Sequence, residues 1–160
     1  FDVARWMLGE EVETIQAAAS VLVDPKIGEL GDFDSANVIL CTASGRQAII
    51  TNSRRSAYGY DQRIEVHGSD GMASAANTHE NRVTVANASG YQQPPLLDFF
   101  MTRYTAAYAA EITAFVEATL NGTTPPTTGD DGLKALALAD AALKSVVEGR
   151  VVRLDEILTA

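Results

Sequence analysis

The feature that most constrains the fold of this chain is a single change in its hydrophobic period. Between residues 13 and 86 apolar side chains alternate with polar or small ones, whereas after Pro95 they recur every three or four residues. Alternation is typical of half-buried strands, and the longer period is typical of amphipathic helices. Strands followed by helices predict an α+β fold, an open and predominantly antiparallel sheet with two long helices packed on one face.

The longest alternating segment, residues 13–24, predicts the first strand. One face of this strand would carry Ile15, Ala17, Ala19, Val21 and Val23. The other face would carry Thr14, Gln16, Ala18, Ser20 and Leu22. This second face is small and uncharged, so it would also suit burial against another subunit. Residues 25–34 contain a proline and two glycines, and they are expected to form a loop.

Shorter strands are expected at residues 35–42, 46–53, 62–67, 72–75 and 81–86, with a final edge strand at 151–154. The connections are tight: Ala43-Ser44-Gly45 follows the first of these strands, and Gly68-Ser-Asp-Gly71 follows the third. Because no segment long enough for a helix lies between them, we expect an antiparallel meander and not a doubly wound parallel sheet.

Two long helices are expected in the last third of the chain. The first would present Leu97, Met101, Tyr104, Tyr108, Ile112, Phe115 and Thr119 on one face and end at Asn121-Gly122. The second would begin near Asp130-Asp131, where acidic side chains favour a helix start, and end at Gly149. Its expected apolar stripe consists of Leu133, Leu136, Leu143 and Val147. Asp140 falls inside that stripe and is interpreted as a partnered, structural aspartate, a catalytic role being the alternative.

The first nine residues predict the end of another helix. Val3, Trp6 and Met7 have helical spacing, and Gly9 is a typical C-terminal stop. No capping residue precedes this helix, so we infer that the chain is a piece of a longer polypeptide, a processed terminus being the alternative. Its 160 residues fit one domain spanning 1–160.

Composition excludes several classes of function. The net charge of −9 argues against a nucleic acid or an anionic membrane as partner, and no apolar run is long enough to span a bilayer. One cysteine, Cys41, and no signal peptide indicate a reducing compartment, so we expect a cytoplasmic protein. His67 and His79 are the only histidines, and no metal site is expected. No dinucleotide, P-loop or nucleophile-elbow motif occurs, so the chain alone is not expected to be a complete enzyme.

The richest set of hydrogen-bonding groups lies between Ser53 and Gly68. Tyr58 and Tyr60 flank a glycine there, and arginines stand at 54, 55 and 63. Tyrosine rings and their hydroxyls suit a polyhydroxylated ligand, which offers both C–H faces and many hydroxyls. The alternative is a pair of strand tyrosines beside solvated arginines, and solvation or a subunit contact is the preferred interpretation for Arg54 and Arg55.

Three sequence blocks resemble the glucose–fructose oxidoreductase/inositol dehydrogenase/MocA (Gfo/Idh/MocA) family. They are Asp2-Val-Ala-Arg-Trp-Met-Leu-Gly-Glu10, Tyr58-Gly-Tyr-Asp61 leading to Glu65-Val-His-Gly-Ser-Asp-Gly71, and Arg103-Tyr-Thr-Ala-Ala-Tyr108 with Glu111. They occur in the family's order and cover essentially the whole chain. The Tyr-Gly-Tyr-Asp block is similar to that of inositol 2-dehydrogenases.

The resemblance implies the carboxy-terminal, substrate-binding and oligomerisation domain of an NAD-dependent oxidoreductase acting on a cyclic polyol such as myo-inositol, or on a related sugar. Matched residue by residue, Asp2, Tyr60 and Tyr108 are the expected substrate-binding residues. A core position is the alternative for Tyr108.

The resemblance places the catalytic residues outside this chain. The catalytic histidine and aspartate would lie upstream of Phe1, and the catalytic lysine would lie in the NAD-binding Rossmann domain that precedes them. No catalytic residue is therefore expected within residues 1–160, and an isolated fragment is expected to be inactive.

The resemblance also implies dimers built on the open sheet, and tetramers built from dimers. The sequence points to the same surface, because the face with Thr14 and Gln16, extended by Thr42 and Thr51, lacks the charges expected of an exposed sheet. Two alternatives remain open: the loops at 25–34 and 78–95 could cover this face, and the domain could serve assembly without any part in catalysis.

Overall fold

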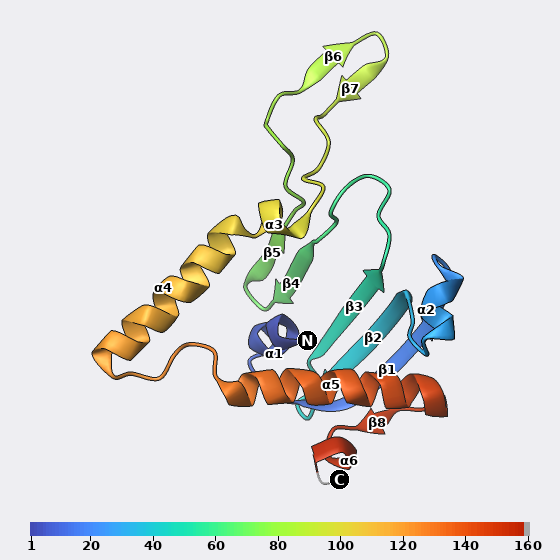
Figure 1. Cartoon of the computed structure of the whole chain (residues 1–160), viewed down its shortest axis with the longest axis vertical. Helices are drawn as coiled ribbons and strands as arrows, with labels where there is room; N and C mark the ends of the chain where they lie inside the picture. The colour runs from blue at the N-terminus through green and yellow to red at the C-terminus, as the bar shows by residue number, and fades with distance from the viewer. Residues whose placement is uncertain (159–160) are drawn as a thin grey trace. The chain divides into compact units, whose positions relative to one another are not determined.

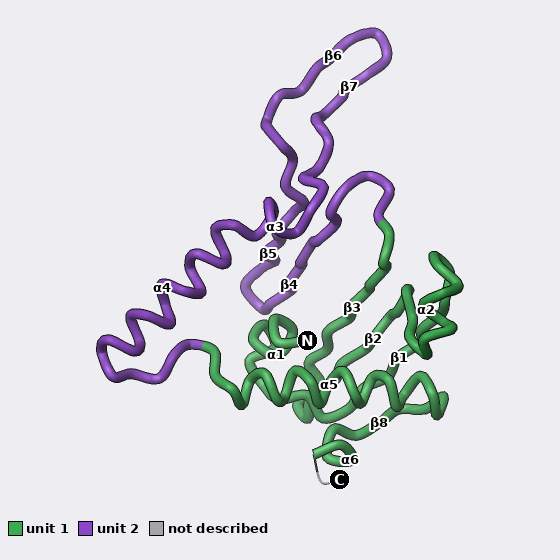
Figure 2. Tube along the Cα trace, in the orientation of Figure 1, with its two compact units in different colours: residues 1–55, 127–160 green, residues 56–126 purple. Residues whose placement is uncertain are grey.

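The computed structural model describes residues 1–158 of the chain. By their contacts the residues divide into two compact units, one formed by residues 1–55 with 127–160 and the other by residues 56–126 (Figure 2). We call them unit 1 and unit 2, and describe each by itself. Both mix helices with open antiparallel strands, which confirms the expected combination of elements (Figure 1).

Unit 1 contains a four-stranded antiparallel sheet. Its strands are β1 (Val12–Ser20), β2 (Ser35–Thr42), β3 (Gln47–Ser53) and β8 (Val152–Arg153), in the order β3-β2-β1-β8. The register places Ile15 opposite Leu40, and Val38 opposite Ile50. β1 alternates as the sequence predicts, with Ile15 buried and Gln16 exposed. β2 alternates too, with Val38 and Leu40 buried on the same face as Ile15 and Ile39 exposed on the other.

The first strand ends at Ser20, earlier than expected, because a buried carboxylate binds the backbone that follows it. Asp34 accepts hydrogen bonds from the N–H groups of Leu22, Val23 and Asp24 over 2.7–3.0 Å. Those donors are therefore not available to a neighbouring strand.

The expected loop at residues 25–34 contains a short helix, α2 (Pro25–Glu29). Asp24 caps it by accepting a hydrogen bond from the Lys26 N–H over 3.0 Å, and Pro25 occupies the first helical position. Proline and an acidic cap favour a helix start as much as a loop, which is why the loop prediction was wrong here.

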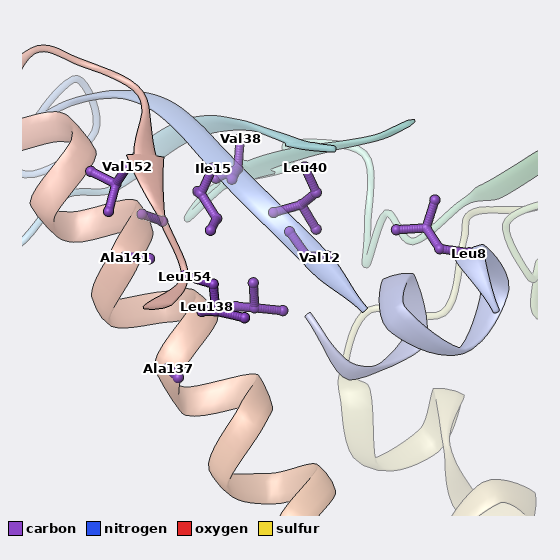
Figure 3. Packing of buried hydrophobic residues seen from close by; sticks show 11 residues of the cluster. Leu8, Val12, Ile15, Val38, Leu40, Ala137, Leu138, Ala141, Val152 and Leu154 are labelled. Carbon is purple, nitrogen blue, oxygen red and sulfur yellow. The ribbon is translucent and has the colours of Figure 1, made fainter. Parts of the chain in front are cut away.

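The long helix of unit 1, α5 (Gly129–Glu148), has the expected ends. Thr128 and Asp131 form a reciprocal capping box, and Gly149 terminates the helix with φ 64°. The residues that α5 buries are Ala137, Leu138, Ala141, Ala142 and Ser145. The four apolar ones pack with Leu8, Val12, Ile15, Val38, Leu40, Val152 and Leu154 to form the core of unit 1 (Figure 3).

The predicted apolar stripe of α5 was wrong in its orientation. Leu133, Leu136, Leu143 and Val147 are 58%, 58%, 50% and 73% exposed. Asp140 lies among them and is exposed too, so it is not a partnered aspartate of a buried stripe. Alanine side chains let a helix backbone approach a sheet closely, and the alanine-rich face is the one that packs.

Two smaller helices complete unit 1. α1 (Asp2–Leu8) ends at Gly9 with φ 61°, as expected, and buries Leu8. α6 (Asp155–Leu158) was not foreseen from the sequence. Glu156 in α6 pairs with Arg150 over 2.6 Å and with Lys144 over 3.2 Å, so α6 is tied to the end of α5.

Unit 2 holds two separate hairpins instead of a continuation of one sheet. β4 (Ile64–Gly68) pairs with β5 (Gly71–Ala75), and β6 (Val85–Asn87) pairs with β7 (Gly90–Gln92). Within residues 1–158 the strands thus form three sheets, which corrects the expectation of a single one. The expected strand at 81–86 starts only at Val85, and its partner β7 was missed.

The first long helix of the prediction is two helices, α3 (Phe100–Arg103) and α4 (Thr105–Asn121), broken at Tyr104. α4 ends at Gly122 with φ 64°, as expected. Because α4 belongs to unit 2, the packing of both long helices on one sheet face stays a prediction. No helix among residues 1–158 is long and apolar enough to cross a membrane.

Candidate functional site

Three tyrosines of unit 2 form a cluster. The rings of Tyr60 and Tyr104 meet edge to face, with centroids 5.7 Å apart, and those of Tyr104 and Tyr108 do the same at 6.5 Å. Tyr60 lies in the segment before β4, whereas Tyr104 separates α3 from α4 and Tyr108 stands on the first turn of α4. Edge-to-face pairs of this kind stabilise a fixed ring geometry.

The segment that carries Tyr60 is held against residues 96–97. The Tyr60 N–H donates to the Leu97 carbonyl over 2.8 Å. Gly59 has φ +125°, and a Cβ atom there would lie 2.6 Å from the Leu96 Cβ. Glycine is therefore required at 59, both by the backbone conformation and by the close approach to Leu96.

Asp61, the residue directly after Tyr60, is held in place by hydrogen bonds from three side chains. Asp61 accepts hydrogen bonds from Arg63 Nε at 2.8 Å and Nη2 at 2.9 Å, from Asn77 Nδ2 at 2.8 Å, and from the Tyr58 hydroxyl. The hydrogen bonds of Arg63, then those of Tyr58 and Asn77, hold the pKa of Asp61 well below its usual range. Asp61 is thus an acceptor that organises the Tyr58–Asp61 turn, and it is not a proton donor at neutral pH.

Tyr104 is the member of the cluster that contacts both of the others. Its hydroxyl donates to Gln62 Oε1, and the Arg103 guanidinium lies 5.3 Å from its ring centroid. Partial burial, and then the neighbouring Tyr60 hydroxyl, raises the pKa of Tyr104 to about 12. The phenol therefore stays protonated at neutral pH, where it can donate and accept hydrogen bonds but cannot act as a base.

The structure brings together two of the three expected substrate-binding residues. Tyr60 and Tyr108 both contact Tyr104, which we expected only as part of an apolar helix face. A signal for Tyr104 was present, because it precedes Tyr108 by four residues and four-residue spacing places side chains on one helix face. Tyr108 is 42% exposed, so the alternative of a core tyrosine does not describe it in this chain.

Asp2, the third expected residue, lies in unit 1. Its carboxylate pairs with Arg5 Nη1 over 3.0 Å, and about half of its side chain, 47%, is exposed. The Arg5 side chain is only 9% exposed and also contacts Glu11 and Asp131. The hydrogen bonds of Arg5 and then of Lys134 lower the pKa of Glu11 to about 2. Asp2 is therefore oriented by a buried guanidinium while part of its carboxylate faces solvent.

Phe1, the residue directly before α1, has a structural role in unit 1. Its side chain is partly buried against the core, and its carbonyl accepts a hydrogen bond from the Arg5 N–H over 3.1 Å. A phenyl ring has no group that could transfer a proton, so Phe1 is not itself a catalytic residue. The expectation that the catalytic histidine and aspartate lie upstream of Phe1 stays a prediction.

Beside the Tyr58–Asp61 turn, unit 2 has an open hollow of about 480 Å³, lined by Tyr58, Arg63, Asn77, His79, residues 93–96 and Ala76. His79 Nδ1 lies 2.6 Å from the Pro94 carbonyl. Since a carbonyl only accepts, this nitrogen carries the proton. Among residues 1–158, no three His, Cys, Asp or Glu side chains are grouped to hold a metal ion.

On strands β1–β3, the sheet face of unit 1 opposite α5 is uncharged, and Arg153 of β8, opposite Thr14, adds a charge at the edge of this face. Its exposed residues on β1–β3 are Gln16, Ala18, Ser20, Asn37, Ile39, Gln47, Ile49, Thr51 and Ser53, and Cys41 is half-buried on the same side. Ile39 and Ile49 are direct cross-strand neighbours, 39% and 71% exposed. Thr42 was expected on this face but is buried, 5% exposed, on the α5 side. Arg54 and Arg55 are exposed beyond the end of β3, as expected.

Comparison with known proteins places these observations in one family. The GFO/IDH/MocA C-terminal domain pattern matches residues 1–74. An inositol 2-dehydrogenase of Rhizobium meliloti is 56% identical over 154 residues, 96% of this chain and 47% of that protein. The chain thus spans about half the length of the curated relatives it matches.

Solved structures agree with the sequence matches. A myo-inositol dehydrogenase from Corynebacterium glutamicum superposes with a TM-score of 0.91 at 37% identity, over 96% of this chain and 46% of that one. A scyllo-inositol dehydrogenase from Lactobacillus casei, with bound NAD(H) and scyllo-inositol, gives 0.86 at 28% identity, over 96% and 45%. The chain belongs to the Gfo/Idh/MocA oxidoreductase family, whose carboxy-terminal domain it matches.

Proposed function

We propose that residues 1–160 act as one substrate-binding and oligomerisation domain of an NAD-dependent dehydrogenase that oxidises a cyclic polyol, myo-inositol or a close relative. The observation that carries this proposal is the cluster of Tyr60, Tyr104 and Tyr108, whose hydroxyls and ring edges suit a ligand with many hydroxyls. The names of the relatives supply the substrate class.

In the parent enzyme, NAD would accept the hydride when a ring alcohol is oxidised. The residues of this chain include no dinucleotide loop, and we assign NAD binding and proton abstraction to the remainder of the enzyme. Our proposal for this chain is positioning: Tyr60 and Tyr108 of unit 2 bind ring hydroxyls and so select which carbon is presented. For Asp2 of unit 1 we keep the separate proposal that its carboxylate accepts hydrogen bonds from substrate hydroxyls. Correct orientation alone accounts for a large part of enzymatic rate enhancement.

The direct test is turnover by the full-length enzyme, with myo-inositol compared with glucose at equal concentrations and NAD reduction followed by its absorbance. We expect preference for the inositol, and for the isolated 160-residue chain neither turnover nor calorimetric binding of NAD. Preference for glucose would favour the alternative of another sugar dehydrogenase of the family. Absence of turnover of any polyol would favour the alternative of a non-catalytic assembly domain.

We further propose that the uncharged sheet face of unit 1 pairs with the same face of a second copy, and that such dimers assemble into tetramers. Two copies with a net charge of −9 repel, so a contact between them should use an uncharged surface, and strands β1–β3 offer one. Exposed Ile39 and Ile49 side by side would supply an apolar centre, and two-fold pairing is the commonest symmetry.

The half-buried Cys41 lies on this same face and is unpaired, which provides a probe and supports a reducing, cytoplasmic location. We expect sedimentation of the enzyme to show oligomers whose Cys41 reacts slowly with a thiol reagent, and faster on dilution to monomer. A monomer at micromolar concentration would exclude this contact.

A further inference from the structure

The side chain of Asn77, in the segment after β5, makes two hydrogen bonds in opposite directions. Its Oδ1 accepts from the Gln62 N–H over 2.8 Å, and its Nδ2 donates to Asp61 Oδ1 over 2.8 Å. Only one orientation of the amide satisfies both partners, because a backbone N–H needs an acceptor and a carboxylate needs a donor. Asn77 is half-buried, so both bonds are shielded in part from water.

These two bonds control the residues that directly follow Tyr60. Asp61 and Gln62 are held by the two ends of the same amide, which fixes the direction of the chain as it leaves Tyr60. The Gln62 side chain in turn accepts the hydrogen bond of the Tyr104 hydroxyl. Asn77 is therefore connected to Tyr60 through the backbone and to Tyr104 through Gln62.

The other partners of Asp61 are less able to set this geometry. The Arg63 side chain is 68% exposed and Tyr58 is 61% exposed. Exposed ion pairs contribute little because water and salt screen them. The Asn77 amide is partly shielded from water, and both its oxygen and its nitrogen are hydrogen-bonded, so it constrains the positions of Asp61 and Gln62 more strongly than these exposed side chains do.

We propose that Asn77 is a positioning residue of the site, which holds Tyr60 and Tyr104 at the separation and tilt that a cyclic polyol needs. The identity of the ligand in this inference rests on the proposed function. The claim that Asn77 positions the two tyrosines rests on its hydrogen bonds alone. Asparagine is the side chain that fits: aspartate would lack the donor and repel Asp61, and alanine would leave the Gln62 N–H and Asp61 without this partner.

The test uses the full-length enzyme labelled with 3-fluorotyrosine, whose ¹⁹F NMR signals report the surroundings of each tyrosine ring. Each signal from this chain's five tyrosines is assigned with a Tyr→Phe variant. Asn77→Ala is compared with Asn81→Ala, a matched control because Asn81 is exposed and accepts a local hydrogen bond from the Val83 N–H. Asn77→Ser keeps a small polar group and serves if the alanine variant does not fold.

We expect Asn77→Ala to shift the signals of Tyr60 and Tyr104 and to leave that of the exposed Tyr91 in place, while Asn81→Ala shifts neither cluster signal. In turnover assays the KM for myo-inositol should rise by about 2- to 10-fold, the effect of one neutral hydrogen bond. A merely structural role would lower kcat through a smaller folded fraction and leave KM unchanged.

Unshifted Tyr60 and Tyr104 signals in a folded variant at position 77 would overturn the inference, whatever the activity. Shifted signals with an unchanged KM would overturn it as well, because the tyrosine geometry would then be irrelevant to the polyol. If the signals shift as expected but even the unmodified enzyme turns over no polyol, the positioning of the tyrosines stands and the proposed substrate class fails.

Discussion

Ser145 on α5 and Ala17 on β1, 128 residues apart in the chain, are joined by a hydrogen bond in which the Ala17 N–H donates to Ser145 Oγ over 2.9 Å. The same hydroxyl donates to the Arg150 carbonyl over 2.6 Å. Ser145 is 1% exposed, so one buried hydroxyl connects the helix, the central strand and the turn that leads to β8. A buried group with both functions satisfied is costly to remove.

Ser145→Ala should therefore destabilise the protein by about 1–3 kcal/mol, because it leaves a strand N–H and a carbonyl without this partner in the interior. The measurement is the free energy of unfolding in urea. Ser20→Ala, at an exposed position of β1, is the control and should change little. Equal effects of the two substitutions would contradict the linking role of Ser145.

The orientation of α5 can be tested with two leucines two positions apart. Leu138 is 0% exposed, and Leu138→Ala should cost about 2–5 kcal/mol through lost burial and the cavity it leaves. Leu136 is 58% exposed, and Leu136→Ala should cost less than about 0.5 kcal/mol in a monomer. Both are read from urea denaturation, and the reverse order of costs would restore the stripe predicted from the sequence.

Asp34 should make the stability of unit 1 sensitive to acid. Burial by itself raises the pKa of this carboxyl, but the N–H donors of Leu22, Asp24 and Val23 and the Ser35 hydroxyl outweigh it and lower the pKa to about 2. The ordinary value is about 3.9, so this stabilisation is complete above that pH and is lost as the pH falls toward 2.

Asp34→Asn should consequently flatten the decline in unfolding free energy between about pH 5 and pH 2, besides lowering stability at neutral pH. Asp32→Asn is the matched control, since Asp32 is exposed and accepts a local hydrogen bond from the Phe33 N–H. Denaturation series at several pH values give the comparison. Parallel curves for wild type and Asp34→Asn would show that other carboxyls cause the acid sensitivity.

Tyr60→Phe in the full-length enzyme should leave the fold intact and lower kcat/KM by the equivalent of about 0.5–1.5 kcal/mol, the net value of one neutral hydrogen bond. Tyr91→Phe removes a hydroxyl from an 85% exposed ring in β7 and should have no kinetic effect. The measurement is kcat/KM for myo-inositol, compared between the Tyr60→Phe and Tyr91→Phe variants. An unchanged kcat/KM for Tyr60→Phe would show that the tyrosine serves structure alone.

Ile49→Glu should dissociate the proposed dimer without unfolding unit 1, because it places a charge at the centre of the neutral face. Asn52→Glu adds the same charge to the same strand on the opposite side, at an exposed position, and should leave association unchanged. Sedimentation velocity measures the outcome, with circular dichroism as the check on folding. An oligomer that survives Ile49→Glu would have to use another surface.

The sequence by itself determined the elements whose cause is local. Alternation along residues 13–20 placed Ile15 on the inner face of the sheet, because side chains of a strand point to opposite sides whatever surrounds them. The sequence likewise predicted the helix ends at Gly9, Gly122 and Gly149, and all three glycines adopt positive φ. The sequence between Ser53 and Gly68 also indicated a hydrogen-bonding segment around Tyr60, whose part in substrate binding stays a prediction.

Only the tertiary structure decided which face of α5 is buried, where β1 ends and which tyrosines meet. Hydrophobicity favoured the leucine face of α5, but the sheet accepts the alanine face because small side chains permit close approach. β1 stops where Asp34, more than ten residues further along the chain, accepts the hydrogen bonds of the Leu22 and Val23 N–H groups. Tyr104 contacts Tyr60 at the point where the chain breaks between α3 and α4, and no period in the sequence encodes a contact between segments so far apart.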